Sequence, residues 1–230
     1  MPQGRAVVIA IDGPAASGKG TLARRIAAEL GYAWLDTGLI YRAAGMIAVD
    51  AGANPADPVA AAEAARTLAH RIADQGPAAM DDPRLRGDMA ADAASKLSVV
   101  PAARAALLEL QRAFARNPSS HGRPAAGAVL DGRDIGTVIC PDADVKLYVI
   151  AAVEERARRR VKELQGRGQA AIYDAVLEDL KQRDARDSQR AVAPLKPAGD
   201  AFLLDTSALD ADQALAAALS LINDKLSRAT

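Results

Sequence analysis

The sequence predicts an α/β fold with a parallel sheet of five strands flanked by helices. Short runs of apolar, often β-branched residues, such as residues 6–11, are typical of strands that are buried on both faces of a parallel sheet. These runs alternate with longer segments of helical periodicity, as they do in strand–helix–strand units. A glycine-rich loop also joins the first apolar run directly to the first helical segment.

The expected strands are short and apolar, whereas the expected helices are rich in alanine, which has a high helix propensity. Strands are expected at residues 6–11, 32–36, 126–131, 144–151 and 201–205. Helices are expected at residues 22–30, 37–49, 55–75, 89–97, 101–116, 153–164, 171–190 and 210–226. Gly31 is suited to end the first helix, and Pro101 is suited to the first turn of the fifth. Residues 117–124 are expected to form a loop.

The chain carries 29 basic and 29 acidic residues, and half of its residues are hydrophobic. This balance excludes a disordered chain and does not favour a protein that coats nucleic acid. Cys140, the only cysteine, rules out an internal disulfide framework and is compatible with a reducing compartment. No run of about 18 apolar residues is present, and residues 1–5 are too short and polar for a secretory signal. We therefore expect a cytoplasmic protein that contacts neither nucleic acid polymers nor membranes.

The glycine-rich loop from Gly13 to Lys19 matches the pattern G-x4-G-K between a strand and a helix, which is the context of a phosphate-binding loop. In such loops backbone N–H groups and the helix N-terminus face the phosphates, and the lysine reaches the β- and γ-phosphates. The residue after Lys19 is Gly20 and the hydroxyl follows at Thr21, so Thr21 is not assigned as a direct Mg²⁺ ligand. An ordinary glycine turn is the alternative. The loop predicts a P-loop NTPase fold that binds ATP through Gly13, Pro14, Ala15, Ala16, Ser17, Gly18, Lys19, Gly20 and Thr21.

Polar residues follow two of the expected strands. Asp131 ends an apolar run, at the edge of the sheet where ligands bind in α/β folds, and its carboxylate could hold Mg²⁺ through water. The alternative is a simple Asp-Gly turn. Asp36 and Thr37 are suited to cap the next helix, and a hydroxyl at that position can also meet an anion. Arg42 follows on the same side of that helix, with an ordinary surface arginine as the alternative.

Two arginine-rich segments lie later in the chain. Arg183, Asp187 and Arg190 are spaced to share one helix face, which would suit a ribose and a phosphate; a solvated salt-bridge ladder is the alternative. Arg156 and Arg160 belong to a basic cluster that precedes the flexible segment 166–168. We interpret this cluster as a short mobile lid whose arginines would neutralise charge that develops on phosphates. A charged solvent face is the alternative there.

Four segments together resemble the bacterial cytidylate kinases, which are nucleoside monophosphate kinases: the loop with its Lys-Gly-Thr variant, and residues 35–42, 131–137 and 183–194. The similarity runs from about residue 8 to 205. It implies transfer of the γ-phosphoryl group of ATP to CMP or dCMP, with Mg²⁺. The same resemblance implies a role for each candidate residue. The acceptor phosphate would be bound by Thr37, Arg42, Arg133 and Arg190, and the monophosphate would be bordered by Asp36 and Asp131. The sugar would be contacted by Arg183 and Asp187, cytosine would be read by Ser95, Arg104 and Asp134, and catalysis would be served by Lys19, Arg133, Arg156, Arg160 and Arg190.

The resemblance also implies a single kinase domain that acts as a monomer on small nucleotides. Its core would cover about residues 1–36, 101–152 and 191–230, its monophosphate-binding lobe about 37–100, and its lid about 153–190. Family members often carry antiparallel strands in that lobe, but residues 52–85 show no alternating pattern, so this insert is expected to be shortened or helical. The alternatives are another small P-loop kinase, similar to adenylate or shikimate kinase, and a non-catalytic ATP-binding module.

Some side chains are expected to have no catalytic role. Trp34 and Phe114 are expected in the core, and Cys140 is expected to pack in or near the sheet. His70 and His121 have no neighbours at metal-ligand spacing.

Overall fold

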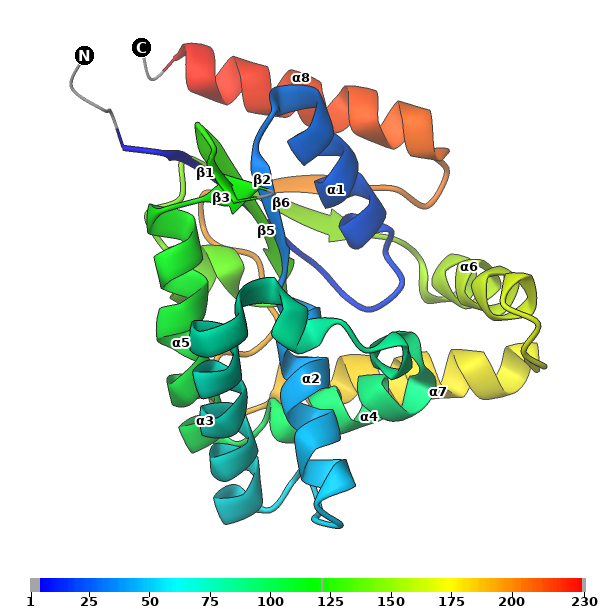
Figure 1. Ribbon diagram of the computed structural model, residues 1–230. Coiled ribbons are helices and arrows are strands. Elements are labelled where there is room, and N and C mark those ends of the chain that lie inside the picture. Colours follow the sequence, from blue (N-terminus) through cyan, green and yellow to red (C-terminus); the bar gives the residue numbers. More distant parts are fainter. Residues whose placement is uncertain (1–4, 121, 229–230) are drawn as a thin grey trace. The chain divides into compact units, whose positions relative to one another are not determined.

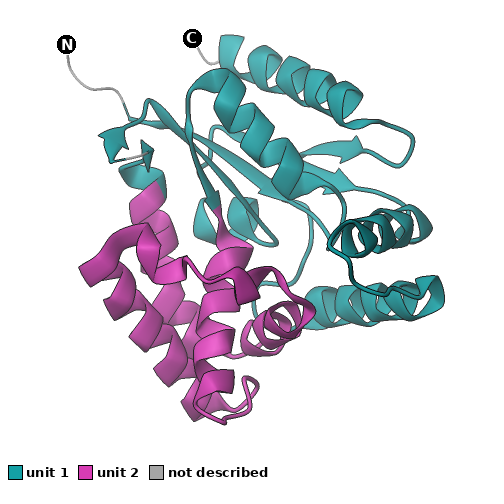
Figure 2. Cartoon of the chain, turned by 45° about the vertical axis from the view of Figure 1, so that its right-hand side comes forward, with its two compact units in different colours: residues 1–35, 115–230 teal, residues 36–114 magenta. Residues whose placement is uncertain are grey.

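The computed structural model describes residues 5–120 and 122–228 (Figure 1). His121 and residues 1–4 of the N-terminal segment therefore lie outside the described residues. The chain forms two compact units: a larger one of residues 1–35 and 115–230, and a smaller one of residues 36–114 (Figure 2). Among the described residues, no helix is both long enough and apolar enough to cross a membrane.

The larger unit is built on a five-stranded sheet. Its strand order is β2 (Ala33–Asp36), β5 (Gly127–Gly132), β1 (Val7–Asp12), β6 (Val145–Ile150) and β7 (Phe202–Asp205). β1 pairs in parallel with both β5 and β6, and β6 pairs in parallel with β7. β1 and β5 are buried along almost their whole length, because helices cover both faces of such a sheet. The predicted α/β class and the five-stranded sheet are confirmed.

Two helices pack on one face of the sheet through the main apolar core. Helices α1 (Lys19–Leu30) and α8 (Ala211–Ser227) lie beside each other there (Figure 1). Their side chains meet alternate residues of the central strands, as the two-residue period of a strand requires. This core includes Ile9, Ile11, Leu22, Ile26, Val129, Leu147, Val149, Ala218 and Ile222. The core fixes the position of α1, and hence of the loop that precedes it.

The helix ends follow local chemistry. Gly31 adopts the left-handed conformation that closes α1, as expected from the sequence. Asp210 caps α8 in a capping box with Gln213. Helices α6 (Val153–Gly166) and α7 (Tyr173–Gln189) form a hairpin that packs on the glycine-rich loop through a small apolar cluster of Ala15, Ala157 and Leu180.

Two short elements of the larger unit have no counterpart among the predicted ones. The expected loop at 117–124 contains a two-residue antiparallel pair, β3 (Ser119–Ser120) with β4 (Arg123–Pro124). After β5 the chain makes one turn of π-helix, η3 (Ile135–Ile139). Elements this short leave no periodicity that sequence patterns can detect.

The smaller unit contains α2 (Thr37–Asp50), α3 (Pro58–Gln75), the 3₁₀ turns η1 (Gly76–Met80) and η2 (Pro83–Arg86), α4 (Asp88–Leu97) and most of α5 (Pro101–Arg116). Segment 52–85 is therefore helical, which was one of the two expected forms. Alanines make up much of its interior, and small side chains allow helix axes to approach closely. One close approach is at Gly45 of α2, where a Cβ atom would lie only 2.8 Å from the backbone carbon of Ala93 in α4.

We expect Gly45→Ala to destabilise the protein by roughly 1–3 kcal/mol, because the added methyl overpacks a helix contact. This cost exceeds the gain in helix propensity of about 1 kcal/mol. Gly166→Ala in α6 is the matched control, since a Cβ there has no neighbour within 4 Å. Urea denaturation of both variants measures the difference. Equal unfolding midpoints would contradict the close approach of α2 and α4.

Candidate functional site

The glycine-rich loop connects β1 to α1 by an unusual backbone path. A Cβ atom on Gly13 would lie 2.1 Å from the carbonyl oxygen of Val149 in β6, so only glycine fits there. Gly18 has a φ of 87°, and Ala16 has a φ of 58°, a conformation that L-residues adopt at some cost. This path ends at the N-terminus of a 12-residue helix, where backbone N–H groups favour an anion.

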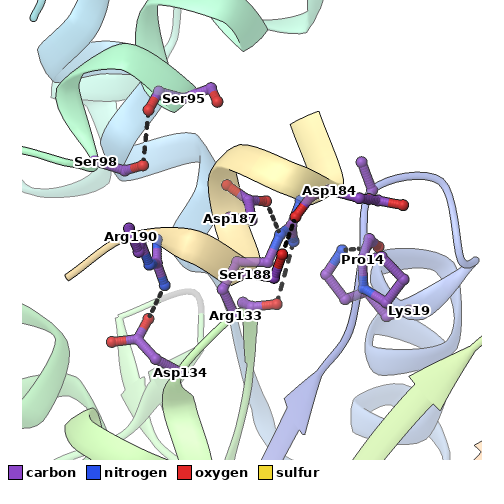
Figure 3. A network of polar contacts seen from close by, with 12 residues as sticks. Pro14, Lys19, Ser95, Ser98, Arg133, Asp134, Asp184, Asp187, Ser188 and Arg190 are labelled. Carbon is purple, nitrogen blue, oxygen red and sulfur yellow. Dashed lines mark hydrogen bonds and ion pairs between the residues drawn. The ribbon is translucent and has the colours of Figure 1, made fainter. Parts of the chain in front are cut away.

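Two polar side chains of this loop, those of Lys19 and Ser17, are buried. Lys19 begins α1, is buried, and donates from Nζ to the carbonyl oxygen of Pro14 at 3.1 Å (Figure 3). Ser17 is fully buried, and its Oγ has no hydrogen-bond partner among the described residues. A buried hydroxyl without a partner is costly unless a ligand or water satisfies it, which fits a loop made to receive phosphate oxygens. Thr21 lies farther along α1 and is exposed.

Asp131 lies at the end of β5, next to the first turn of α1. One carboxylate oxygen, Oδ1, is 3.8 Å from the place of a Cβ on Gly20. The other, Oδ2, accepts a hydrogen bond of 2.8 Å from Nε1 of Trp34. Trp34 is 37% exposed, so the prediction that it lies in the core was wrong: the indole turns its N–H to a carboxylate at the edge of the sheet. Phe114 is only partly buried.

The carboxylate of Asp131 suits one kind of metal. The described residues contain no group of three or more His, Cys, Asp or Glu side chains that could hold a metal ion by themselves. Mg²⁺ commonly binds through one or two carboxylates together with substrate phosphates, and it keeps several of its waters. A single carboxylate beside a phosphate loop therefore fits Mg²⁺ carried by a nucleotide.

Asp12, the last residue of β1, was not singled out from the sequence. Its carboxylate accepts hydrogen bonds of 2.8 Å from the backbone N–H groups of Ile135 and Gly136. Burial raises the pKa of this carboxyl to about 6, against the opposing effect of the two hydrogen bonds. The available signal was an acidic residue that ends a buried strand directly before the phosphate loop.

Arg133 and Asp187 form a shielded ion pair between the segment after β5 and helix α7. Nε of Arg133 lies 2.9 Å from Oδ2 of Asp187, and both side chains are largely buried (Figure 3). Desolvation alone would raise the pKa of Asp187, but the charges of Arg133, Arg183 and Arg190 hold it below its usual range. The three arginines and this carboxylate therefore share one electrostatic environment.

Arg190 reaches this cluster in a different way from the predicted one. Helix α7 ends at Gln189, and Arg190 has an extended backbone, so the expectation that it shares a helix face with Arg183 and Asp187 was wrong. The chain turns back instead, and Nε of Arg190 donates to the carbonyl oxygen of Ala193. Its Nη2 lies 3.6 Å from Oδ1 of Asp134 (Figure 3).

Arg156 is a buried tether and not an exposed lid side chain. Only 5% of the residue is exposed, and its guanidinium donates to the carbonyl oxygens of Ala151 and Ala15 at 3.0 and 3.1 Å. It also makes a bidentate pair with Asp184, at 3.1 and 2.5 Å. Arg156 thus joins α6 and α7 to the phosphate loop through a carbonyl of the loop itself.

The neighbouring arginines of α6 make other contacts. Arg160 donates to Glu163 on the same helix at 2.8 Å. Arg159, which was not predicted as a site residue, donates from Nη2 to the carbonyl oxygen of Thr206 at 2.6 Å. Its Nη1 is 3.7 Å from the place of a Cβ on Gly18, so Arg159 borders the phosphate loop.

The smaller unit holds the remaining candidates, which lie on α2, α4 and α5. Asp36 caps α2 as predicted, since its Oδ1 accepts from the N–H of Leu39 at 3.1 Å. Thr37 follows as a buried residue of the first turn. Arg42 donates from Nη1 to the carbonyl oxygen of Leu85 at 3.0 Å, which fixes its direction within this unit.

Ser95 and Arg104 are both buried and are linked through Ser98. The carbonyl oxygen of Ser95 accepts from the Ser98 hydroxyl at 2.9 Å (Figure 3), and the carbonyl oxygen of Ser98 accepts from Arg104 at 3.4 Å. The guanidinium of Arg104 also lies over the ring of Tyr41, 5.5 Å from its centroid, in a cation–π arrangement. Ser95, Ser98 and Arg104 are thus linked to one another in the interior of the helical unit.

Comparison with known proteins gives a consistent result. A family model described as cytidylate kinase matches residues 9–224. The cytidylate kinase of Paramagnetospirillum magneticum is 60% identical over 218 residues, which are 95% of this chain and 98% of the relative. That of Rhodospirillum rubrum is 55% identical over 219 residues, with the same shares of both chains. An uncharacterized protein of Eubacterium ventriosum of known structure has a TM-score of 0.52 at 14% identity, over 94% of this chain and 98% of that chain, which is a likeness of fold alone.

We expect Arg156→Ala to lower the free energy of unfolding by roughly 2 kcal/mol, less than for a fully buried pair because 28% of the Asp184 side chain is exposed. The matched control on the same helix is Arg158→Ala, whose side chain is 65% exposed and should cost less than about 0.5 kcal/mol. Urea denaturation measures both variants. A tether at Arg156 is ruled out if the two variants unfold at the same midpoint.

Proposed function

The chain belongs to the cytidylate kinase family, and we propose that it transfers the γ-phosphoryl group of ATP to CMP or dCMP, giving ADP and CDP or dCDP. The observation that carries this function is the high identity to curated cytidylate kinases over nearly the whole of both chains. It favours this reaction over that of an adenylate- or shikimate-kinase-like enzyme and over a non-catalytic ATP-binding module. The roles of individual residues follow from the arrangement of the site.

The donor side consists of the phosphate loop. Backbone N–H groups of the loop and the N-terminus of α1 would hold the ATP phosphates, and the Ser17 hydroxyl would gain the partner that it lacks within the described chain. Lys19 would exchange its bond to the Pro14 carbonyl for the β- and γ-phosphates. Because the ammonium already lies across the loop, little motion is needed to bring it to the transferring group.

Mg²⁺ would be held by Asp131, through water, together with the ATP phosphates. When bound it supplies charge that neutralises the phosphate oxygens during transfer. The chain contributes the direction of the carboxylate: Trp34 binds Oδ2, which leaves Oδ1 on the side of Gly20 and the start of α1.

The acceptor side would use two sets of residues. In the larger unit, Arg133 and Arg190 would bind the phosphate of CMP, Arg183 and Asp187 would bind its ribose, and Asp134 would face the cytosine edge. In the smaller unit, Asp36, Thr37 and Arg42 would border the monophosphate, and Ser95 and Arg104 would read cytosine. Hydrogen-bonding groups that match the amino donor and ring acceptor of cytosine are left unsatisfied by another base, which gives selectivity.

Phosphoryl transfer needs positioning and charge stabilisation more than covalent chemistry. We assign charge stabilisation to Lys19, Arg133, Arg160 and Arg190. For Arg156 we propose a supporting role, in which its bond to the Ala15 carbonyl holds the phosphate loop in its binding conformation. The α6–α7 hairpin would then serve as the lid through its more exposed side chains.

The setting of the reaction is part of the proposal. CMP, dCMP and ATP are cytoplasmic metabolites in bacteria, so we place the enzyme in the cytoplasm. A monomer is sufficient, since every proposed site residue comes from one chain. Small nucleotides are the proposed partners, with no nucleic acid polymer or membrane among them.

A coupled assay of ADP release with CMP, dCMP, UMP, AMP and shikimate as acceptors tests this function, and we expect CMP or dCMP to be preferred. Lys19→Ala should reduce turnover with the preferred acceptor by roughly 100-fold or more, since a donor that stabilises developing charge is lost. Lys225→Ala on the exposed face of α8 is the control and should keep wild-type turnover. No acceleration by any acceptor would favour the non-catalytic module, and near-normal turnover of Lys19→Ala would refute the assignment of the loop.

Asp187→Ala is expected to raise the KM for CMP by about tenfold, as loss of one charge-assisted hydrogen bond would. The KM for ATP should stay within twofold, because Asp187 pairs with Arg133 and not with the phosphate loop. Asp179→Ala, an exposed position on the same helix, is the control. Steady-state kinetics with each substrate varied in turn separate the two constants. A rise in the KM for ATP alone would place α7 on the donor side.

A further inference from the structure

Asp12 is a buried acidic residue to which the proposed reaction gives no role. Asp12 is the last residue of β1 and only 4% exposed. The parallel register places it beside Gly132 of β5 on one side and Tyr148 of β6 on the other. It therefore lies between the phosphate loop, which begins at the next residue, and the segment that follows β5.

The contacts of Asp12 are specific. Each carboxylate oxygen accepts one backbone N–H at 2.8 Å, Oδ1 from Ile135 and Oδ2 from Gly136. Hydrogen bonds to a charged acceptor are shorter and stronger than neutral ones, so the two bonds together fix both the place and the direction of this turn. Arg133 and Asp134 are the two residues immediately before these amides.

The position also leaves little freedom around the turn. A Cβ on Gly136 would lie 3.1 Å from Cδ of Lys146 and 3.5 Å from Oδ2 of Asp12. The side chain of Lys146 is itself held by Asp200 and the carbonyl oxygen of Pro141. The turn is thus confined between the Asp12 carboxylate and an anchored lysine stem.

We propose that Asp12 is a positioning residue for the acceptor nucleotide: through the amides of Ile135 and Gly136 it aims Arg133 and Asp134, and it joins their turn to the donor loop. This inference rests on the proposed roles of Arg133 and Asp134. Those two side chains make their own ion pairs with Asp187 and Arg190 on the far side of the turn. A shift of the turn would therefore move the whole acceptor set relative to the phosphate loop.

The energetics favour a functional role for this carboxylate over a stabilising one. Desolvation by burial and, to a smaller extent, the nearby Asp134 raise its pKa, the two amides and Arg133 lower it, and the net pKa is about 6. Tyr148 faces it from β6 and the stem of Lys146 approaches from the same strand. Because the folded-state pKa lies above the unfolded value near 4, the contribution to stability is present at low pH and is lost as pH rises through about 6. At neutral pH the protein therefore keeps a charge that opposes folding.

The ionised form is the strong acceptor for both N–H groups. Protonation turns one oxygen into a hydroxyl group, and asparagine would replace one oxygen by an NH₂ group that faces an amide N–H. Protonation therefore weakens one of the two bonds, and asparagine removes it. Loss of a single charge-assisted bond of this kind costs enough to shift binding by about tenfold.

The test uses Asp12→Asn in the full chain. We expect the KM and the dissociation constant for CMP to rise about tenfold and those for ATP to stay within twofold. Asp224→Asn, at an exposed acidic position on α8, is the control: it leaves the turn, its two amides and the anchored Lys146 untouched, so both constants should stay at the wild-type values. Thermal denaturation of all three proteins accompanies the kinetics. Equal weakening of CMP and ATP would indicate a general structural role and overturn the proposal.

A pH series gives a readout that a merely structural role would not move. We expect the ratio of CMP affinities, wild type over Asp12→Asn, to be largest near pH 7.5 and to fall toward one below pH 6. The phosphate of CMP itself titrates near pH 6, and the ratio removes this effect because both proteins bind the same ligand. A flat ratio would count against the proposal.

Two further outcomes are separable. If the wild type fails to phosphorylate CMP, the proposed function is wrong; if it phosphorylates CMP and Asp12→Asn has a normal KM for CMP, only the positioning role is wrong. If Asp12→Asn does not fold, a pH titration of the wild-type protein tests the positioning role instead. The amide resonances of Ile135 and Gly136 should then shift together around pH 6, in parallel with the affinity for CMP. If the affinity for CMP changes independently of these amide shifts, the positioning role of Asp12 is refuted.

Discussion

Each charged side chain that is buried at the carboxyl edge of the sheet needs a hydrogen-bond or ion-pair partner. The geometry of the site depends on these partners. β1, β5 and β6 run parallel, so their ends and the residues that follow them meet at one edge. Burying a charge there without a partner would cost several kcal/mol. Asp12 is satisfied by two backbone amides, and Arg133 and Arg190 are paired with Asp187 and Asp134. The same bonds that satisfy these charges hold them in fixed positions.

Local chemistry made much of the architecture predictable. The phosphate loop is a contiguous motif between a strand and a helix, and Asp36 caps α2 by accepting a hydrogen bond from a residue only three positions away. Both features could therefore be predicted without knowledge of the fold. The central strands β1, β5 and β6 followed from continuous apolar runs that the sheet largely buries on both faces, whereas the edge strands β2 and β7 are only partly buried. The lack of alternation in segment 52–85 correctly excluded the antiparallel strands and left a helical form as one of two possibilities. All these features are set by neighbours in sequence.

Contacts between distant residues account for what the sequence did not reveal. Asp12 binds amides 123 and 124 residues away, and nothing near it in sequence indicates them. Trp34 was expected in the core, but its indole N–H donates to Asp131, which is 97 residues away in the sequence. The early end of α7 reflects the bonds of Arg190 to Ala193 and Asp134, which outweigh the helical spacing. Helical periodicity predicts a face, and tertiary partners decide where the helix stops.

The neutral total charge and the choice of arginine have one explanation. Of the 29 basic residues, 22 are arginine, and acidic residues balance them in number. The planar guanidinium matches carboxylate and phosphate with the same pair of donors. An arginine that is held by a carboxylate before the nucleotide binds, as Arg133 is by Asp187, already has the direction that a phosphate requires. The acidic residues therefore do more than cancel charge: they hold the arginines in fixed directions, which a surplus of unpaired lysines would not achieve.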